Sequence, residues 1–188
     1  VAWCWKANGG TTSSNTDGSI TSTVQANTKA GFSIVKYTGN QSNATIGHGL
    51  GVVPEMIIAK GLYVQNWAVY HKDAGSNYWL QLNGATAKID EPIWQDTTPT
   101  SSVFSVNNNV VINKSSSDSI AYCFASVAGY SSIGSYTGNG AITGPLVNTG
   151  FEPAMIILKE YDGVDNWAIV DNKRSTTNPR QNWLRPNL

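Results

Sequence analysis

Residues 119–125 read Ser-Ile-Ala-Tyr-Cys-Phe-Ala and are apolar on both sides of an extended chain. Successive side chains of a strand point to opposite faces, so Ile120, Tyr122 and Phe124 share one face while Ala121 and Cys123 share the other. A strand that is apolar on both faces is typically covered on both faces. The stretch therefore predicts a central strand of a β-sandwich.

The chain opens with a similar pattern. Residues 1–5 read Val-Ala-Trp-Cys-Trp, which resembles Ile-Ala-Tyr-Cys-Phe at 120–124. Both segments precede a glycine-containing stretch and then a Tyr-Thr-Gly segment. We therefore interpret the opening segment as the last strand of a preceding unit. Residues 7–30 are rich in Ser, Thr, Gly and Asn and follow it as a connection.

A longer repeat links the two halves of the chain. Residues 36–60 and 135–159 share a Tyr-Thr-Gly-Asn segment, a glycine-rich stretch and a Pro-x-Met-Ile-Ile-x-Lys segment without a gap. After one inserted residue, Asn-Trp-Ala at 66–68 matches Asn-Trp-Ala at 166–168. Self-similarity of this kind is typical of tandem repeats.

The repeat predicts three segments with a period of about one hundred residues. Residues 1–30 hold the last strand of a preceding unit and its connection, residues 31–130 form one complete β-sandwich unit, and residues 131–188 form the first half of a second, truncated unit. Asn-Trp-Leu at 182–184 resembles Tyr-Trp-Leu at 78–80, in the middle of the complete unit. Both ends of the chain are thus expected to cut a repeat.

Strand signals occur along the whole chain, and sustained helical periodicity is absent from the sequence. Asparagines at 107–109 predict a hairpin turn, because Asn tolerates positive φ. The predicted fold class is all-β, with jelly-roll-like β-sandwich units in tandem. The predicted strands are 1–6, 20–25, 31–37, 43–47, 54–60, 66–71, 77–82, 102–106, 109–113, 119–125, 132–137, 153–159, 166–171 and 181–185.

The composition argues against two classes of partner. Charged residues make up only 13% of the 188 residues and the formal net charge is zero, against roughly 25% charged residues in an average soluble domain. Phosphate binding needs clustered Lys and Arg, so we expect no nucleic-acid partner. The longest apolar runs are too short to cross a bilayer, so we expect no membrane insertion.

The two cysteines, Cys4 and Cys123, occupy equivalent positions in the repeat. A pair of cysteines in a secreted domain often indicates a disulfide. Equivalent positions in successive units belong to different cores, which argues against that pairing. We expect two buried free thiols that pack as small apolar side chains.

Residues with catalytic or metal-binding potential are few. His48 and His71 are the only histidines, and no spacing of His and Cys is typical of a zinc site. Asp73 follows His71, but no Gly-x-Ser-x-Gly segment supplies a nucleophilic serine. Nothing in the sequence marks two facing carboxylates for glycoside hydrolysis, and the acidic loop at 160–165 matches no EF-hand. We expect no enzyme activity, no metal site and no cofactor.

Aromatic residues supply the candidate ligand-binding set. The chain has 7 Trp and 8 Tyr, and exposed rings stack on sugars or anchor protein interfaces. Trp67 and Trp167 recur at one position of the repeat and are expected in the core. The candidates for exposed anchors lie at strand ends or near loops: Tyr63, Tyr70, Trp79, Trp94 and Tyr161.

Several segments together suggest a family. They include Val-Ala-Trp-Cys-Trp-Lys-Ala-Asn-Gly-Gly at 1–10, Gly-His-Gly-Leu at 47–50, Asn-Trp-Ala-Val-Tyr-His at 66–71, Ala-Tyr-Cys-Phe at 121–124 and Gly-Ser-Tyr-Thr-Gly-Asn-Gly at 134–140. The sequence resembles, over nearly its whole length, large virion structural proteins of marine tailed phages and metagenomic relatives. The resemblance implies a structural or receptor-facing role in a tail fibre or capsid fibre, and it carries over no functional residues.

Three functions stay open on this basis. The first is a virion structural protein that forms a fibre or appendage and contacts the host surface. The second is a carbohydrate-binding, lectin-like module of a secreted or cell-surface protein, and the third is a subunit of a non-viral extracellular filament. The expected partners are other copies of the chain, other virion proteins and host surface glycans. We expect a homo-oligomer, a trimer from fibre architecture, located in the virion or outside the cell.

Overall fold

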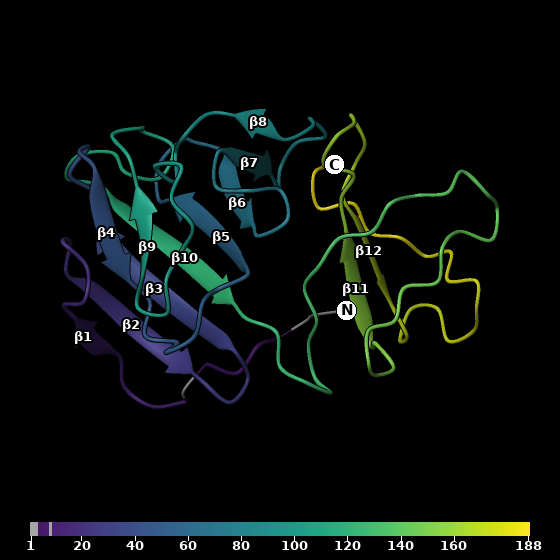
Figure 1. The fold of residues 1–188 in the computed structure, drawn as a ribbon. Coiled ribbons are helices and arrows are strands. Elements are labelled where there is room, and N and C mark those ends of the chain that lie inside the picture. Colours follow the sequence, from purple (N-terminus) through teal and green to yellow (C-terminus); the bar gives the residue numbers. More distant parts are fainter. Residues whose placement is uncertain (1–3, 8) are drawn as a thin grey trace.

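The computed structural model describes residues 4–7 and 9–188. These residues form twelve strands in mainly antiparallel sheets and contain no helix, so the all-β prediction is confirmed (Figure 1). The strands are β1 (Ser13–Asn15), β2 (Ser22–Asn27), β3 (Phe32–Thr38), β4 (Ala44–Gly47), β5 (Met56–Gly61), β6 (Trp67–His71), β7 (Tyr78–Gln81), β8 (Ile89–Asp90), β9 (Val103–Val106), β10 (Asp118–Phe124), β11 (Met155–Leu158) and β12 (Ala168–Asp171).

Eight strands form one large sheet in the order β1-β2-β3-β10-β5-β6-β7-β8. β10 is the last of these strands in the sequence but lies in the middle of the sheet. Its Ala121 is opposite Val35 of β3 on one side and Ala59 of β5 on the other, so both edges of β10 are hydrogen-bonded. The central position predicted for residues 119–125 is therefore confirmed.

The main core lies on one face of this sheet. Val35, Ile57 and Ala121 point into it and are fully buried. The short sheet formed by β4 and β9 covers this face, in front of β3 and β10 in Figure 1. Phe104 of β9 packs edge-to-face on Tyr37 of β3, with ring centroids 6.2 Å apart. Each large apolar side chain buried in this way contributes about 1.5–3 kcal/mol to folding.

The opposite face of the large sheet carries a second apolar row. Ile58 of β5 is opposite Val69 of β6, which is opposite Leu80 of β7. The hairpin β11–β12 packs on this row through Trp167, whose side chain is only 5% exposed. The described residues therefore form two apolar clusters, one on each face of the large sheet.

The segment 109–113 does not form the predicted strand, and 107–109 is not a hairpin turn. β9 pairs instead with β4, and the chain after it folds into turns. Asn107 Oδ1 accepts a hydrogen bond from Asn109 N, and Asn109 Oδ1 accepts one from Val111 N, both at 2.8 Å. Such side-chain bonds to nearby backbone compete with a strand ladder, which explains the wrong prediction.

The predicted strands 132–137 and 181–185 are also wrong, apart from one isolated bridge between Leu184 and Ile169. β3, whose sequence resembles 132–137, is held by a strand on each side. Within the described part of the chain, no strand lies beside residues 132–137, so the backbone of this segment forms no hydrogen bonds with a neighbouring strand. The predicted strand 1–6 falls partly outside the described residues, and residues 4–7 are not a strand.

Both cysteines are free thiols, as expected, but only one is buried. Cys123 lies in the core on β10, and burial raises the pKa of its thiol to about 12. Cys4 is exposed, so the expectation that it packs in a core is wrong. It precedes Trp5, which rests on Phe32 and Phe124 at the end of the large sheet.

Asn113 is the polar centre of the turn region. Its side chain is fully buried and joins three segments of the chain. Asn113 Nδ2 donates to the carbonyl oxygens of Ser42 at 2.8 Å and Asn107 at 2.6 Å, while its Oδ1 accepts from Asn40 N at 3.0 Å. A buried amide with these partners stabilises loops that have no strand ladder of their own.

Asn113→Asp tests this role. The new carboxylate would face two carbonyl oxygens in a buried site, so we expect a loss of about 3–5 kcal/mol of unfolding free energy at pH 7. The loss should shrink near pH 4, because a protonated carboxyl can donate to one carbonyl. Urea denaturation measures both values. Asn108→Asp, on an exposed side chain of the same turn, is the control and should change stability by less than about 0.5 kcal/mol. Equal losses in the two variants would contradict the role of Asn113.

Candidate functional site

Three of the five candidate aromatic anchors are buried. Tyr70, Trp79 and Trp94 are 2%, 3% and 1% exposed, so the expectation that they lie on the surface is wrong. Tyr70 is opposite Ile57 and shares its core-facing side. Trp94 lies on a loop that folds over the core, with its ring 6.0 Å from that of Tyr70 and 6.3 Å from that of Phe104.

The other two candidates, Tyr63 and Tyr161, are half-buried and engaged within the chain. The Tyr63 hydroxyl donates to Val110 O at 2.8 Å and accepts from Lys114 N at 3.2 Å. Lys114 Nζ lies 5.3 Å from the centre of the Tyr63 ring. Tyr63 therefore holds the loop after β5 against the turn at 110–114. Ligand binding by these two residues stays a prediction.

Tyr161 belongs to a cluster that we call the Lys88 clamp, formed by Tyr78, Lys88, Tyr161 and Asp162. Lys88 Nζ lies 4.9 Å from the centre of the Tyr78 ring and 5.0 Å from that of Tyr161. It also pairs with Asp162 at 2.7 Å, and this hydrogen bond raises the pKa of Lys88. The clamp joins the segment before β8 to the loop after β11, and cation–π contacts add to the ion pair.

Trp67 and Trp167, the aromatics expected in the core, differ from each other. Trp167 is buried, whereas Trp67 is half-buried. The indole Nε1 of Trp167 donates to Gln81 O at 2.7 Å, so its polar atom is also satisfied. Trp167 is thus the central side chain of the contact between β11–β12 and the large sheet.

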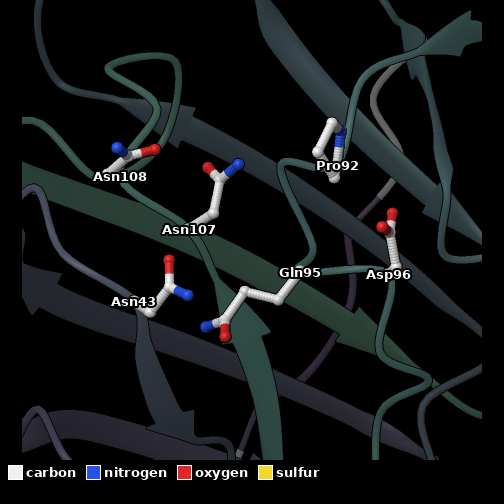
Figure 2. A pocket seen from close by; sticks show the side chains of 6 residues that line it. All are labelled: Asn43, Pro92, Gln95, Asp96, Asn107 and Asn108. Carbon is white, nitrogen blue, oxygen red and sulfur yellow. The ribbon is translucent and has the colours of Figure 1, made fainter.

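A polar depression of about 330 Å³ opens beside the β4–β9 pair. Figure 2 shows Asn107, Asn108 and Asn43 on one side of it, Pro92 and Asp96 on the other, and Gln95 between them. The candidate residues from the sequence are all absent from its lining. The Asn-rich run at 107–109, from which the sequence predicts a hairpin turn, contributes Asn107 and Asn108 to the lining.

The backbone beside the depression is unusual. Gln95 and Asp96 have φ values of 56° and 48°, in the left-handed region that non-glycine residues rarely occupy. Gln95 Nε2 donates to Ala44 O at 2.9 Å and Val106 O at 2.5 Å, which anchors the turn to β4 and β9. This anchoring compensates for the cost of the conformation, of order 1–3 kcal/mol per residue.

The depression offers hydrogen-bonding groups and little charge. Asn43, Asp96 and Asn108 are exposed, so their amide and carboxylate groups face solvent. These groups can bind hydroxyl groups of a ligand, but the lining has no aromatic ring on which a sugar could stack. Among residues 4–7 and 9–188, no group of three His, Cys, Asp or Glu side chains could hold a metal ion.

A second depression, of about 290 Å³, lies near the start of the chain. Lys6, Asn27, Lys29, Ala30 and Tyr130 line it. The Tyr130 side chain is 57% exposed. This surface combines two ammonium groups with an exposed ring, and Tyr130 is not among the aromatic candidates from the sequence.

The two histidines lie in different environments. His48 is fully buried; its Nε2 donates to Thr100 O at 3.1 Å and its Nδ1 accepts from Leu50 N at 3.2 Å. Burial lowers the pKa of His48, so the ring is neutral at pH 7. His71 Nδ1 accepts from the backbone N of Asp73 at 3.2 Å, which occupies the ring atom that a triad would pair with the carboxylate.

Within the described residues, no helix is long and apolar enough to span a membrane. The part of the chain that the structure describes is an all-β domain with mainly antiparallel sheets, two apolar clusters and a polar depression. The chain belongs to the family "Domain of unknown function (DUF7483)", whose family model matches residues 1–188. No curated protein and no solved structure matches the chain.

The lowered pKa of His48 predicts how the free energy of unfolding depends on pH. Its folded pKa lies below the unfolded value of about 6.5, so the unfolded chain binds more protons just below that pH. The contribution of the neutral His48 ring to the free energy of unfolding should be fully present above pH 6.5. It should decrease as the pH drops toward the folded pKa, by up to about 1.4 kcal/mol per pH unit. Urea denaturation between pH 7.5 and 5 measures the slope.

His48→Gln should flatten this slope while keeping a donor for Thr100 O. The pKa of His71 is also lowered by burial, so His71→Gln is the matched comparison and the double variant should show almost no slope in this range. An unchanged slope in His48→Gln would contradict the assignment of the pH dependence to the buried ring.

Proposed function

We propose that the chain is a structural part of a virion fibre or appendage, built from tandem jelly-roll-like β-sandwich units. The sequence resemblance to phage virion proteins and the internal repeat both favour this role. In this proposal, residues 31–130 are one unit and β11–β12 begins the next. β1 and β2, from the stretch at 7–30 that was expected to be a connection, extend the sheet of this unit at its β3 edge. The core between the large sheet and the β4–β9 pair is consistent with a sandwich-like unit.

Equivalent hydrogen bonds support the tandem arrangement. Trp67 N donates to Asn83 Oδ1 at 2.9 Å, and Trp167 N donates to Asn187 Oδ1 at 3.1 Å. The amides of Asn83 and Asn187 then donate to Asn66 and Asn166, respectively. Strand pairing also corresponds, because Ile157 is opposite Ile169 as Ile58 is opposite Val69.

The observation that carries the proposal is the contact around Trp167. Its buried ring packs with Ile157 of β11 on Met56, Ile58 and Leu80 of the large sheet. A structural fibre needs neighbouring units to be joined by a dry, specific contact. An apolar cluster with a satisfied indole N–H provides such a contact between two segments of related sequence.

Polar contacts surround this apolar cluster. Lys88 N donates to Tyr161 O at 2.7 Å, beside the Lys88 clamp. Lys159 Nζ donates to Ala85 O at 3.4 Å from the start of the loop after β11. These bonds fix the orientation of the hairpin on the large sheet, as rim contacts do at protein interfaces.

Trp167→Ala tests the contact. The variant should release β11–β12 from the large sheet, because losing the ring should decrease the free energy that stabilises this contact by about 3–5 kcal/mol. Hydrogen exchange should show lost protection in β11 and β12, with the amides of β3, β5 and β10 still protected. Trp183→Ala, on a 55% exposed side chain of the same segment, should leave exchange unchanged. Simultaneous loss of protection in both regions would contradict a division into units.

Immunogold electron microscopy tests the location. Antibodies against the purified chain, applied to particles and cells of the source culture, should label an appendage of phage particles. Label on cell-surface filaments would favour the non-viral filament instead. Absence of label from virions would overturn the proposed virion role.

A carbohydrate-binding module is the second candidate, favoured by the exposed amide and carboxylate groups of the polar depression. On a glycan array, binding that is lost in Asn43→Ala and Asp96→Ala but kept in Lys29→Ala would support this candidate. Lys29 lines the other depression and serves as the control. Failure to bind any glycan would exclude the candidate.

A further inference from the structure

The depression lined by Lys6, Asn27, Lys29, Ala30 and Tyr130 lies where two closed turns meet. In the turn between β2 and β3, Ala30 N donates to Asn27 O at 3.1 Å and to Asn27 Oδ1 at 3.2 Å. In the turn at 127–131, Tyr130 N donates to Val127 O at 2.9 Å. Turns that are already closed by hydrogen bonds lose little backbone freedom when a ligand binds to them.

Gly31 packs the two turns against each other. Gly31 O accepts a hydrogen bond from Ala125 N at 2.8 Å, and the φ of Gly31 is 60°, in the region that favours glycine. A Cβ at this position would lie 2.4 Å from Ala125 O, so no other residue permits this contact. The backbone therefore sets the spacing between the turn that carries Lys29 and the turn that carries Tyr130.

Lys6 reaches the depression from a third segment of the chain. Asn27 Nδ2 donates to Lys6 O at 3.0 Å, which joins the segment 4–7 to the turn between β2 and β3. The Trp5 ring lies 5.7 Å from the Phe124 ring and holds the same segment on the large sheet. The depression of about 290 Å³ is thus formed by three segments, each held in place by contacts of its own.

The depression has an excess of positive charge. In the described part of the chain, neither Lys6 nor Lys29 forms an ion pair, and the lining of the depression holds no carboxylate. Glu55, beside the second turn, is already paired with Lys72 at 3.2 Å. The sequence places no Asp or Glu at positions 1–3 or 8. Two ammonium groups are therefore available to an anionic ligand.

We propose that this depression binds an acidic sugar, with its carboxylate between the ammonium groups of Lys6 and Lys29 and its ring on Tyr130. The Tyr130 side chain is 57% exposed, so its ring can pack on the apolar face of a pyranose. Ammonium groups donate strong, charge-assisted hydrogen bonds to a carboxylate. Two cations suit one carboxylate, whereas a nucleic acid needs a longer basic surface. The proposal goes beyond the structural role and does not involve the polar depression.

A titration of the isotope-labelled chain with trigalacturonate, followed by NMR, tests the proposal. The fully methyl-esterified trisaccharide keeps the rings but not the charge, so it is the matched control ligand. With the acid we expect saturable shifts of the amides at 27–31 and 127–131. The ester should bind more weakly by about five-fold or more, because it offers no ion pair. The amides at 92–96 and 107–108, beside the polar depression, should not shift.

A second pair of ligands distinguishes the source of the acidic sugar. Sialyllactose carries its carboxylate on a terminal sugar, whereas trigalacturonate represents a uronic acid within a polymer. Lactose is the neutral control for sialyllactose. The tighter of the two acidic ligands identifies the source, and increasing the salt concentration should weaken its binding because the site is exposed.

Variants of exposed side chains separate the charge from the ring. Lys29→Ala should weaken binding by about five-fold, whereas Lys29→Arg should keep most of it because the charge is retained. Tyr130→Ala should weaken binding by about three- to ten-fold, whereas Tyr130→Phe should keep it because the ring makes the contact. Asn43→Ala, at the polar depression, is the control and should bind as the unchanged chain does.

Three outcomes would overturn the proposal: no saturable shift with either acidic sugar, equal binding of trigalacturonate and its methyl ester, or unchanged binding by Lys29→Ala. Shifts confined to residues 92–96 and 107–108 would also overturn this site and would favour the polar depression instead. Absence of the protein from virions would overturn the virion role alone and would leave the titration result unaffected.

Discussion

The backbone hydrogen bonds along both edges of β10 are the interaction on which the rest of the structure depends. β10 joins β3 to β5, and without it the large sheet would separate into two smaller groups of strands. The same strand contributes Ala121 and Cys123 to the floor of the main core. Their small side chains leave room for the rings of Tyr37, Tyr70 and Phe104, which fill the space up to the β4–β9 pair.

The strands of the large sheet could be predicted because their signal is local. β3, β5 and β10 lie within a few residues of the predicted 31–37, 54–60 and 119–125, since alternating or fully apolar runs reflect burial directly. The segment 132–137 resembles β3 in sequence but lacks neighbouring strands. Whether such a segment forms a strand depends on partners elsewhere, and a local pattern holds no information about them.

The candidate site was predicted less well for a related reason. A tryptophan near a loop has the same sequence signature whether the loop folds over the core, as at Trp94, or away from it. The polar depression depends on two residues with positive φ, Gln95 and Asp96, and the Gln95 side chain donates hydrogen bonds to the ends of β4 and β9. Neither Gln nor Asp in a sequence predicts a positive φ, so this site can be recognised only once the fold has brought the distant segments together.

The central place of β10 also sets the order of events during synthesis. β3 and β5 emerge from the ribosome with their facing edges unpaired, and they stay so until residue 124 has been made. Pairing between segments so distant in sequence is slow, and unpaired edges expose nascent chains to misassembly. The hairpins β2–β3 and β5–β6 join strands that are close in sequence, so they can form before β10 has been synthesised. The large sheet is therefore completed at its middle, when β10, the last of its strands to be synthesised, pairs with both β3 and β5.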